Sequence, residues 1–458
     1  MRIESALVPV LGAGIVMAAT QLTGLCAASD PTAFRPPAYH PLFSDQDREK
    51  PYVQARSFNF YDFPFLDGQW EGIVCDRDGN VWFSISTHSG THHAQIFRYN
   101  AKQDAVEHVA DVGQVCGEML TGNPPQDKIH SQMFEAGDLI YCGTCEGHVI
   151  TNKPYRGGYW LAINRQTGAV ENLGKSITED GLLCVGYDRV HGLLYGNTNR
   201  KGLLACFDPA TRKEKIVGMP WQDSGAEWPR GLTLMITADG KVYGAKPPNC
   251  TFWEYDPATG KIRNLEVKVP PPADVAAGDK QAIEKYRTSA AHITLWNEQD
   301  QCFYLIRSYD EMLCRFYPPA KGAEARFETI APLGLTGGHQ YGTRYASCTL
   351  VIHNRTVYYT PYTGWGGTAN LVAYNLDSKT YTDFGPLVVE GNRRVNEVHS
   401  MAVGADGRLF MVAFVFSIEG VDPVRENAMR DKYPFHSRLV IVDPAKDAKP
   451  GTAGTGGK

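Results

Sequence analysis

Long patterns of helical periodicity are scarce in this sequence, and so is net charge. The chain carries 45 Lys and Arg against 50 Asp and Glu, and the resulting net charge of −5 is spread along its length. This balance argues against nucleic acid or an anionic membrane as the main partner. The sequence instead contains 46 Gly, 23 Tyr and 19 Phe, which favours many short strands joined by tight turns.

The cysteine spacing of a disulfide scaffold or a zinc finger is also missing. Of the 11 cysteines, several lie in strand-like runs, where a free cysteine acts as a small buried hydrophobe. One or two disulfides, for example between Cys116 and Cys145, are left open by the sequence.

The one long apolar stretch of the sequence lies at the N-terminus. Arg2 is followed by an apolar run over 6–22 and by small residues through Ala28, an order typical of a secretory signal peptide. Gly and Pro in the run argue against a stable membrane span, and Leu25 argues against lipid anchoring at Cys26. We therefore expect a secreted or periplasmic protein, divided into a signal peptide (1–28), an N-terminal linker (29–50), a folded domain (51–446) and a flexible C-terminal tail (447–458).

An internal repeat covers the folded domain. Seven segments share an apolar run, a polar turn that often carries Asp-Gly, and a second run with an aromatic residue near its middle. These aromatic residues recur 48 to 61 positions apart, at Trp82, Tyr141, Tyr195, Tyr243, Tyr304, Tyr358 and Phe410. Each segment reads as a β-hairpin, and a regular period of this length is the sequence signature of a repeat architecture.

Six of these hairpins are followed by a second one, marked by turns such as FDPATRK and YDPATGK. Two hairpins give four antiparallel strands per repeat, which is the unit of a propeller. The sequence therefore predicts an all-β fold, a seven-bladed β-propeller of four-stranded antiparallel blades. The last repeat lacks an outer strand, so we expect an N-terminal strand around 52–60 to complete it and close the ring. A helix is expected between repeats four and five, within 270–288.

Propeller geometry places two groups of residues over the same face of the ring. First strands start there, and connections between second and third strands lie there too. This face is rich in His, Arg and Tyr, which suits an anionic sugar polymer and proton transfer near neutral pH. The residues expected on it include Trp70, Glu71, His88, His130, His148, Arg200, Arg230, His292, Arg307, Tyr362 and His399.

Each of these residues also has a structural interpretation. His130 and His148 can be satisfied histidines without a chemical role, and Arg200 and Arg230 can be ordinary surface charges. Tyr195 is one of seven equivalent aromatic residues, so the repeat by itself indicates packing. The run THSGTHH at 87–93 resembles a metal-binding sequence, but no carboxylate accompanies it and a solvated loop is the simpler interpretation.

The segment DKIHSQMFEAGDLIYCGTCEGH, which contains His130 and His148, resembles the histidine-bearing second blade of the seven-bladed propeller polysaccharide lyases. The similarity is to the ulvan lyases in particular and more distantly to the oligogalacturonate lyases. It implies catalytic roles for four residues. His130 with Arg200 would neutralise the substrate carboxylate, with Arg230 as an alternative arginine, and His148 with Tyr195 would transfer protons.

The leading hypothesis is thus a polysaccharide lyase that cleaves a uronate-containing, ulvan-like polymer by β-elimination, and this substrate class includes sulfated polymers. Arg230, His292, Arg307, Tyr362 and His399 would bind the acidic polysaccharide, and the protein is expected to be a monomer. Catalysis would need no cofactor, while the resemblance leaves open a structural zinc, or a calcium ion. The alternatives are a metal-dependent lyase or lactonase that uses His130, His292 and His399, and a non-catalytic glycan-binding propeller.

Overall fold

The computed structural model describes residues 42–118, 124–146, 155–220, 233–246 and 251–451, except for 268, 270, 288–290, 308–309, 321, 334, 337–338, 341–348, 362–366 and 424–434. Residues 1–28, which were predicted to be a signal peptide, lie outside this part of the chain. So do most of the tail at 447–458 and the first part of the linker at 29–50. Residues 42–50 of the linker hold the 3₁₀-helix η1 (Gln46–Glu49), and Phe43 beside it is buried.

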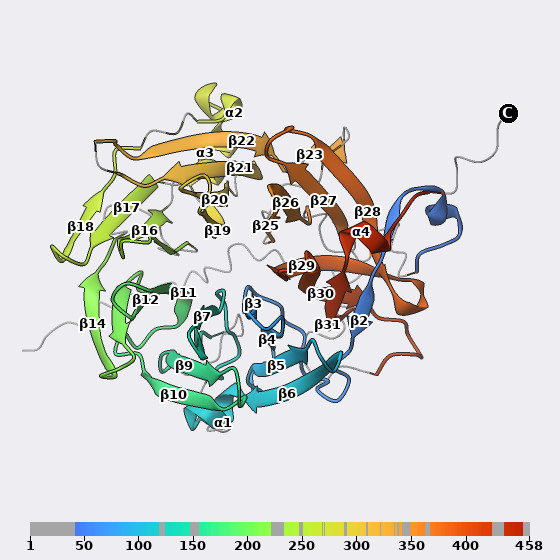
Figure 1. Cartoon of the computed structure of the whole chain (residues 1–458), viewed down its shortest axis with the longest axis horizontal. Coiled ribbons are helices and arrows are strands. Elements are labelled where there is room, and N and C mark those ends of the chain that lie inside the picture. The colour runs from blue at the N-terminus through green and yellow to red at the C-terminus, as the bar shows by residue number, and fades with distance from the viewer. Residues whose placement is uncertain are drawn as a thin grey trace, which may run out of the picture.

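The chain is built from antiparallel sheets arranged in a ring, and the first strands of the repeats labelled in Figure 1 lie nearest the centre. Five repeats form separate four-stranded sheets. Their strands are β3 (Ile73–Cys75), β4 (Val81–Ile85), β5 (Gln95–Asn100) and β6 (Ala105–Asp111); β7 (Phe134–Ala136), β8 (Leu139–Gly143), β9 (Tyr159–Asn164) and β10 (Val170–Lys175); β11 (Leu182–Asp188), β12 (Leu193–Thr198), β13 (Leu204–Asp208) and β14 (Lys213–Gly218); β15 (Met235–Ile236), β16 (Val242–Lys246), β17 (Thr251–Asp256) and β18 (Lys261–Asn264); β19 (Ala291–Asn297), β20 (Cys302–Arg307), β21 (Met312–Tyr317) and β22 (Arg326–Pro332).

The strands of the sixth and seventh repeats belong to one ten-stranded sheet. It contains β25 (Val351–His353), β26 (Thr356–Tyr359), β27 (Asn370–Asn375), β28 (Tyr381–Val389), β29 (Arg393–Val403), β30 (Leu409–Phe416) and β31 (Phe435–Val442), with β1 (Tyr52–Gln54), β2 (Arg56–Phe58) and β32 (Ala448–Lys449). A two-stranded sheet of β23 (Leu335–Thr336) and β24 (His339–Gln340) stands apart.

The expectation of seven separate four-stranded blades is therefore wrong, since five separate blades are present in the described residues. The reason lies in the connection between the sixth and seventh repeats. It is only the 3₁₀-turn η2 (Glu390–Asn392), which is too short to carry the chain out of one sheet and into the next. Strand β28 consequently stays paired with β29, through Val388↔Arg394 and Val389↔Arg393.

The all-β class and the four-stranded antiparallel blade are confirmed, and so is the pairing of the N-terminal strand with the last repeat. Strand β2 runs antiparallel to β31, with Ser57 opposite Val440. Strand β1 adds to the other side of the junction, where Val53 pairs in parallel with Leu387. The two ends of the folded domain thus meet in the same sheet.

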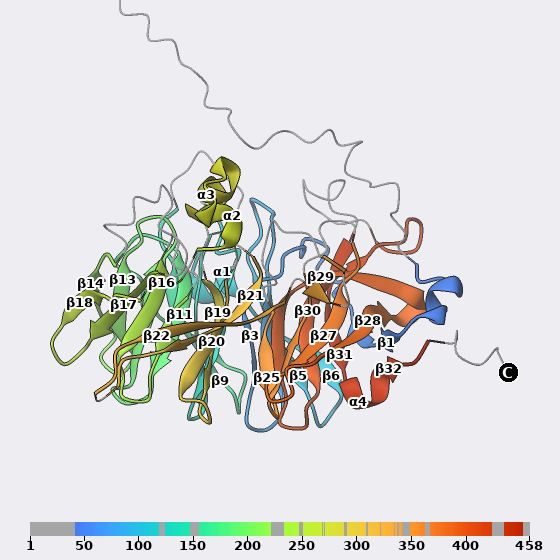
Figure 2. The same cartoon turned by 90° about the horizontal axis from the view of Figure 1, so that it is seen from above.

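Helices are short and few in the described residues: α1 (Val112–Cys116), α2 (Ala273–Ala276), α3 (Lys280–Arg287) and α4 (Pro444–Asp447). The helix expected within 270–288 is present as α2 and α3, which project together from one face of the ring (Figure 2). Asp279 lies at the start of α3, where its side chain accepts a hydrogen bond from the Ala282 amide at 2.7 Å. Because α3 leads into the first strand β19, it marks the face on which first strands start.

The core is divided into clusters between neighbouring repeats, because each sheet buries both of its faces. Tyr195 and Trp253 pack together between the third and fourth repeats. Phe83 and Phe410 belong to the cluster that joins the first repeat to the seventh. Aromatic residues on second strands therefore act mainly as packing residues between sheets.

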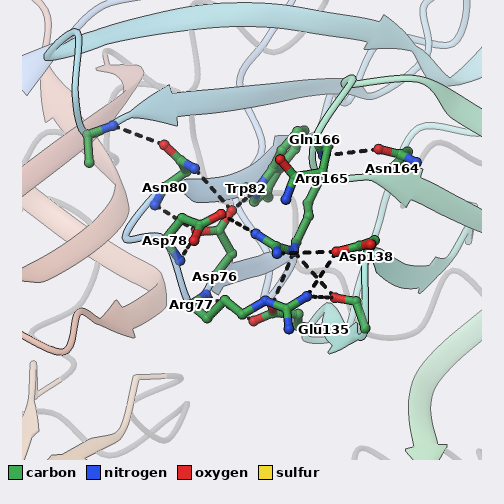
Figure 3. A network of polar contacts seen from close by, with 12 residues as sticks. Asp76, Arg77, Asp78, Asn80, Trp82, Glu135, Asp138, Asn164, Arg165 and Gln166 are labelled. Atoms are coloured by element: carbon green, nitrogen blue, oxygen red, sulfur yellow. Dashed lines mark hydrogen bonds and ion pairs between the residues drawn. The ribbon is translucent and has the colours of Figure 1, made fainter.

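The opposite face of the ring carries ionic contacts between hairpin turns (Figure 3). Arg165, whose side chain is 6% exposed, contacts Asp78 of the first repeat and both Glu135 (3.5 Å) and Asp138 (3.2 Å) of the second. Arg77 reaches across the same junction to Glu135 at 3.1 Å. These contacts connect the first and second repeats at the face away from α2 and α3.

Candidate functional site

The indole ring of Trp70 is the centre of a cluster of ionisable side chains that come from three repeats. Trp70 lies just before β3, and His130 before β7 stacks on its ring with centroids 5.0 Å apart and planes inclined by 16°. His399 of β29 meets the ring edge-on at 5.5 Å, and His88 after β4 does so at 6.5 Å. The Nζ atom of Lys128 lies 3.6 Å from the ring centroid.

This grouping follows from the fold. Trp70 and His130 occupy equivalent positions where the chain approaches a first strand, and His88 lies on a connection between a second and a third strand. Both kinds of position lie on the face that carries α2 and α3. The sequence-based expectation that Trp70, His88, His130 and His399 share one face is thus met in the structure, and we call Trp70 with His88, Lys128, His130 and His399 the Trp70 cluster.

Two of the histidines in the cluster are held by carboxylates. Asp67, 2% exposed, accepts a hydrogen bond from the His88 amide at 2.7 Å and lies 3.2 Å from the ring atom Nδ1. Glu397, 6% exposed, is hydrogen-bonded to Nε2 of His399. A carboxylate beside an imidazole fixes the orientation of the ring.

Lys128 brings a buried cation to the cluster. Lys128 is 1% exposed. Its backbone forms an isolated β-bridge with Cys145 through hydrogen bonds of 3.2 and 2.9 Å. The ammonium group lies close enough to Trp70 for a cation–π interaction, which gains strength where water is excluded. The cluster therefore combines an aromatic surface with a fixed positive charge.

Glu71, the neighbour of Trp70, carries an unusual carboxyl group. Burial raises its pKa to about 8, so the group holds a proton at neutral pH. Burial also raises the pKa of the Cys184 thiol on β11, and the charge of Glu71 adds to this effect.

Several residues predicted for the site fall elsewhere. His148, Arg230 and Tyr362 lie outside the described residues. The backbone of His292 in β19 pairs with that of Ile306 in β20, but the side chain of His292 is also outside the described part. Their proposed roles stay predictions.

Tyr195 does not reach the Trp70 cluster. It is 1% exposed on β12 and packs edge-on against Tyr255, with ring centroids 5.9 Å apart. Burial raises the pKa of its phenol well above the ordinary value. The structure thus places it in the core between two repeats, which agrees with the packing interpretation of the seven equivalent aromatic residues.

Two predicted arginines are already paired with carboxylates. The Nε atom of Arg200 lies 2.8 Å from Glu146, a buried residue whose pKa is raised by burial and lowered in part by Arg200. Arg307 is 4% exposed and forms a two-pronged contact with Asp310 at 2.8 and 2.5 Å. Arg200 keeps an exposed side chain (58%), whereas Arg307 does not.

The described residues contain no group of three or more His, Cys, Asp or Glu placed to hold a metal ion. The three histidines of THSGTHH diverge: His88 faces Asp67, His92 stacks on Phe65 at 4.2 Å, and His93 is buried, where its Nδ1 accepts from the Gln126 amide. Cys302 and Cys314 pack in different core clusters, so they do not form a ligand pair for a structural zinc. Cys116 and Cys145 are both free.

Two members of the site were missed by the sequence reasoning, although a signal for them exists. Lys128 stands two positions before His130, and Glu397 two positions before His399. A charged residue two positions before a histidine is thus common to these two cases.

No family model matches the sequence, and no curated protein matches it. Solved structures do match. A catalytically inactive variant of virginiamycin B lyase from Staphylococcus aureus, solved with quinupristin, has a TM-score of 0.51 at 10% identity and covers 85% of this chain and 99% of its own. The Cps50 (Swd1) β-propeller domain of Myceliophteria thermophila has a TM-score of 0.50 at 8% identity, with 86% and 99% covered.

A Bacteroides fragilis protein whose proposed identity is a 6-phosphogluconolactonase has a TM-score of 0.49 at 13% identity, with 80% of this chain and 98% of its own covered. In the described residues, no helix has both the length and the apolar character needed to cross a membrane. At these identities the likeness concerns the fold alone. The chain is a β-propeller, similar in architecture to proteins of unrelated names.

Proposed function

We propose that this protein is a lyase that cleaves a uronate-containing polysaccharide by β-elimination at the Trp70 cluster. The observation that carries the proposal is the convergence of His88, Lys128, His130 and His399 on one indole ring, on the face where ligands of a ring-shaped fold are expected. The chain as a whole is slightly acidic, so the positive charge of Lys128 beside the ring is a local feature.

An anionic sugar matches this chemistry. The indole of Trp70 offers an apolar surface to the C–H groups of a pyranose ring, and the ammonium of Lys128 offers a charge to a carboxylate. His130, stacked on the same indole, can donate a hydrogen bond to that carboxylate. Neutralising the carboxylate acidifies the adjacent C–H bond, which is the difficult part of β-elimination.

The reaction balances without an oxidant or a reductant. A base removes the proton from the carbon next to the uronate carboxylate, its electron pair forms a carbon–carbon double bond, and the glycosidic C–O bond breaks. A second group protonates the leaving oxygen. Histidines suit both proton transfers near neutral pH. In this proposal His399 is the base, and His148 stays the expected acid from the sequence resemblance.

Tyr195 has no role in the proposed reaction, because it is buried between sheets. Arg200 lies on a connection that faces the site side and keeps an exposed side chain, so it suits contacts with a sulfate or carboxylate further along the polymer. The metal-dependent lyase or lactonase would use His292, whose side chain lies outside the described residues, so it stays an alternative.

The test is the ultraviolet absorbance of unsaturated uronate during incubation of the protein with acidic polysaccharides, ulvan first, with and without chelator. We expect a rising signal that survives the chelator and falls by about 10²-fold or more in His130→Ala and in His399→Ala. His191→Ala is the matched control, because His191 lies on a hairpin turn at the opposite face and contacts Asp188. No signal on any uronate polymer would overturn the proposal.

The non-catalytic glycan-binding propeller is supported by the same aromatic and cationic surface. Affinity electrophoresis in gels containing each polysaccharide separates the two functions. Retardation that is lost in Trp70→Ala but is never accompanied by an unsaturated product would identify a binding protein.

A further inference from the structure

We propose that Glu397 is the positioning residue of His399, and that the pair forms a base dyad in which Nδ1 of His399 accepts the proton. This inference rests on the proposed lyase function and names a residue which that function alone does not require. The local geometry of strand β29 supports this role of Glu397.

Two irregularities occur within β29. Val395 and Glu397 pair with consecutive residues Val415 and Phe414, and Val398 and Ser400 pair with Ala413 and Val412. Asn396 and His399 are therefore extra residues, each without an opposite partner in the ladder. Bulges of this kind turn a side chain out of its regular direction and are frequent beside active sites.

Comparison with other first strands distinguishes this bulge from a general feature of the repeat. Strands β11 and β19 have register shifts at similar places, and there the extra residues are Leu183 and Ile293. Both of these are buried hydrophobic residues. In β29 the equivalent position holds an imidazole, and its bulge turns that imidazole toward Trp70 instead of into a core.

The contacts of the imidazole then define its proton positions. Nε2 of His399 is hydrogen-bonded to Oε1 of Glu397, and a carboxylate can only accept, so Nε2 carries the hydrogen. In the neutral ring, Nδ1 consequently carries a lone pair and no hydrogen. Within the described part of the chain this atom is buried and has no hydrogen-bond partner, which is costly unless a ligand uses it.

Glu397 is held in place for this role. Its residue is 6% exposed, and the amide of Gln69 donates to its backbone carbonyl at 3.0 Å. The hydroxyl of Ser400 donates to the carbonyl of Trp70, which locks β29 against the segment that carries the aromatic ring. The carboxylate is thus fixed relative to both His399 and Trp70.

In the described part of the chain, Glu397 of the same strand contacts His399. Lys128, His130 and His88 of neighbouring elements contact the Trp70 ring, which His399 also meets. Glu397 is the acidic member of this set that touches the imidazole. Its removal should therefore change the behaviour of His399 more than any other single substitution nearby.

The experiment combines kinetics of Glu397→Gln with nitrogen NMR of the histidine rings in the unsubstituted protein. Glu397→Gln keeps the shape and a hydrogen-bond acceptor but loses the charge. We expect kcat to fall about 10²-fold with KM nearly unchanged, and the acidic limb of the pH–rate profile to move to lower pH. Glu397→Asp should recover part of kcat. Glu324→Gln, an exposed residue on a hairpin turn at the opposite face, should behave like the parent.

The NMR measurement needs neither substrate nor a folded variant. We expect the His399 ring at neutral and alkaline pH to carry its hydrogen on Nε2. A hydrogen on Nδ1, or an unchanged pH–rate profile in an active Glu397→Gln variant, would overturn the inference. Absence of any lyase product in the parent protein would instead overturn the proposed function, while the NMR result would still test the tautomer.

Discussion

Trp70 and His130 stack face to face across a junction between two repeats, with ring centroids 5.0 Å apart and planes inclined by 16°. Each residue stands at the equivalent place in its own repeat, just before a first strand. The stack therefore joins equivalent positions of two repeats into a single aromatic and cationic surface.

Replacing Trp70 by alanine removes this surface. We expect KM for the acidic polymer to rise about tenfold, which corresponds to the 1–2 kcal/mol typical of aromatic and cation–π contacts, with a smaller effect on kcat. Initial rates over a range of polymer concentrations measure this change. Trp296→Ala, which removes an indole from β19 that contacts Phe303 and Glu298, is the control, and an equal effect in both variants would contradict the assignment.

The carboxyl group of Glu71 should make the free energy of unfolding depend on pH. Its pKa is raised by burial from 4.5 to about 8, so the folded state retains a proton that the unfolded chain releases. Stability should therefore be greatest below pH 4.5 as far as this group is concerned, and should fall by a few kcal/mol as the pH rises to about 8. Urea unfolding at pH 5, 7 and 9 tests this, and Glu71→Gln should reduce the decline. An identical decline in the variant would show that another group is responsible.

Asp422 predicts the opposite dependence. Burial alone would raise its pKa, but hydrogen bonds from Arg393 and from the hydroxyl of Tyr61 outweigh burial and lower it. The pair stabilises the fold above the ordinary pKa of 3.8, and this stability is lost as the pH falls through the lower value of the folded state. Asp422→Asn should cost about 3 kcal/mol at pH 7 and flatten the acid side of the Tm profile. A Tm profile with an unchanged acid limb would contradict this account.

The prediction of the fold from the sequence was correct where a residue pattern determines structure. Turns and paired runs located the strands of the repeats, and the incomplete last repeat indicated that the segment around Ser57 pairs with β31. The count of separate blades failed because it depends on the tertiary pairing of β28 with β29 across a three-residue turn. Alternation of apolar residues carries no information about where one sheet ends and the next begins.

The site, like the fold, contains residues that the sequence predicted and residues that it did not. Position in the repeat placed Trp70, His130 and His399 on one face. The catalytic role of Tyr195 came from the resemblance alone, and that residue packs between sheets. Lys128 and Glu397 were not among the residues predicted for the site. The bulge at His399 depends on the pairing of β29 with β30, which the sequence pattern does not reveal.

Arg165 predicts how firmly the first two repeats are joined. Its guanidinium is nearly buried and contacts Asp78, Glu135 and Asp138, whereas Arg77 is half exposed. Arg165→Ala should lower the free energy of unfolding by about 2–3 kcal/mol, and Arg77→Ala by less than about 1 kcal/mol. Chemical denaturation of both variants measures the difference. Equal losses would mean that the burial of Arg165 has no energetic consequence.

The pairing of β2 with β31 also sets the order of events during synthesis. Strand β2 is made long before β31, so the ring cannot close until the whole segment between the two strands has been produced. Growing chains hold an open sheet edge throughout this time, and an open edge invites pairing with other chains. Production of this protein should therefore depend more on chaperones than the stability of the finished ring suggests. A circular permutant that keeps β2 and β31 adjacent in sequence should depend less on chaperones for its production.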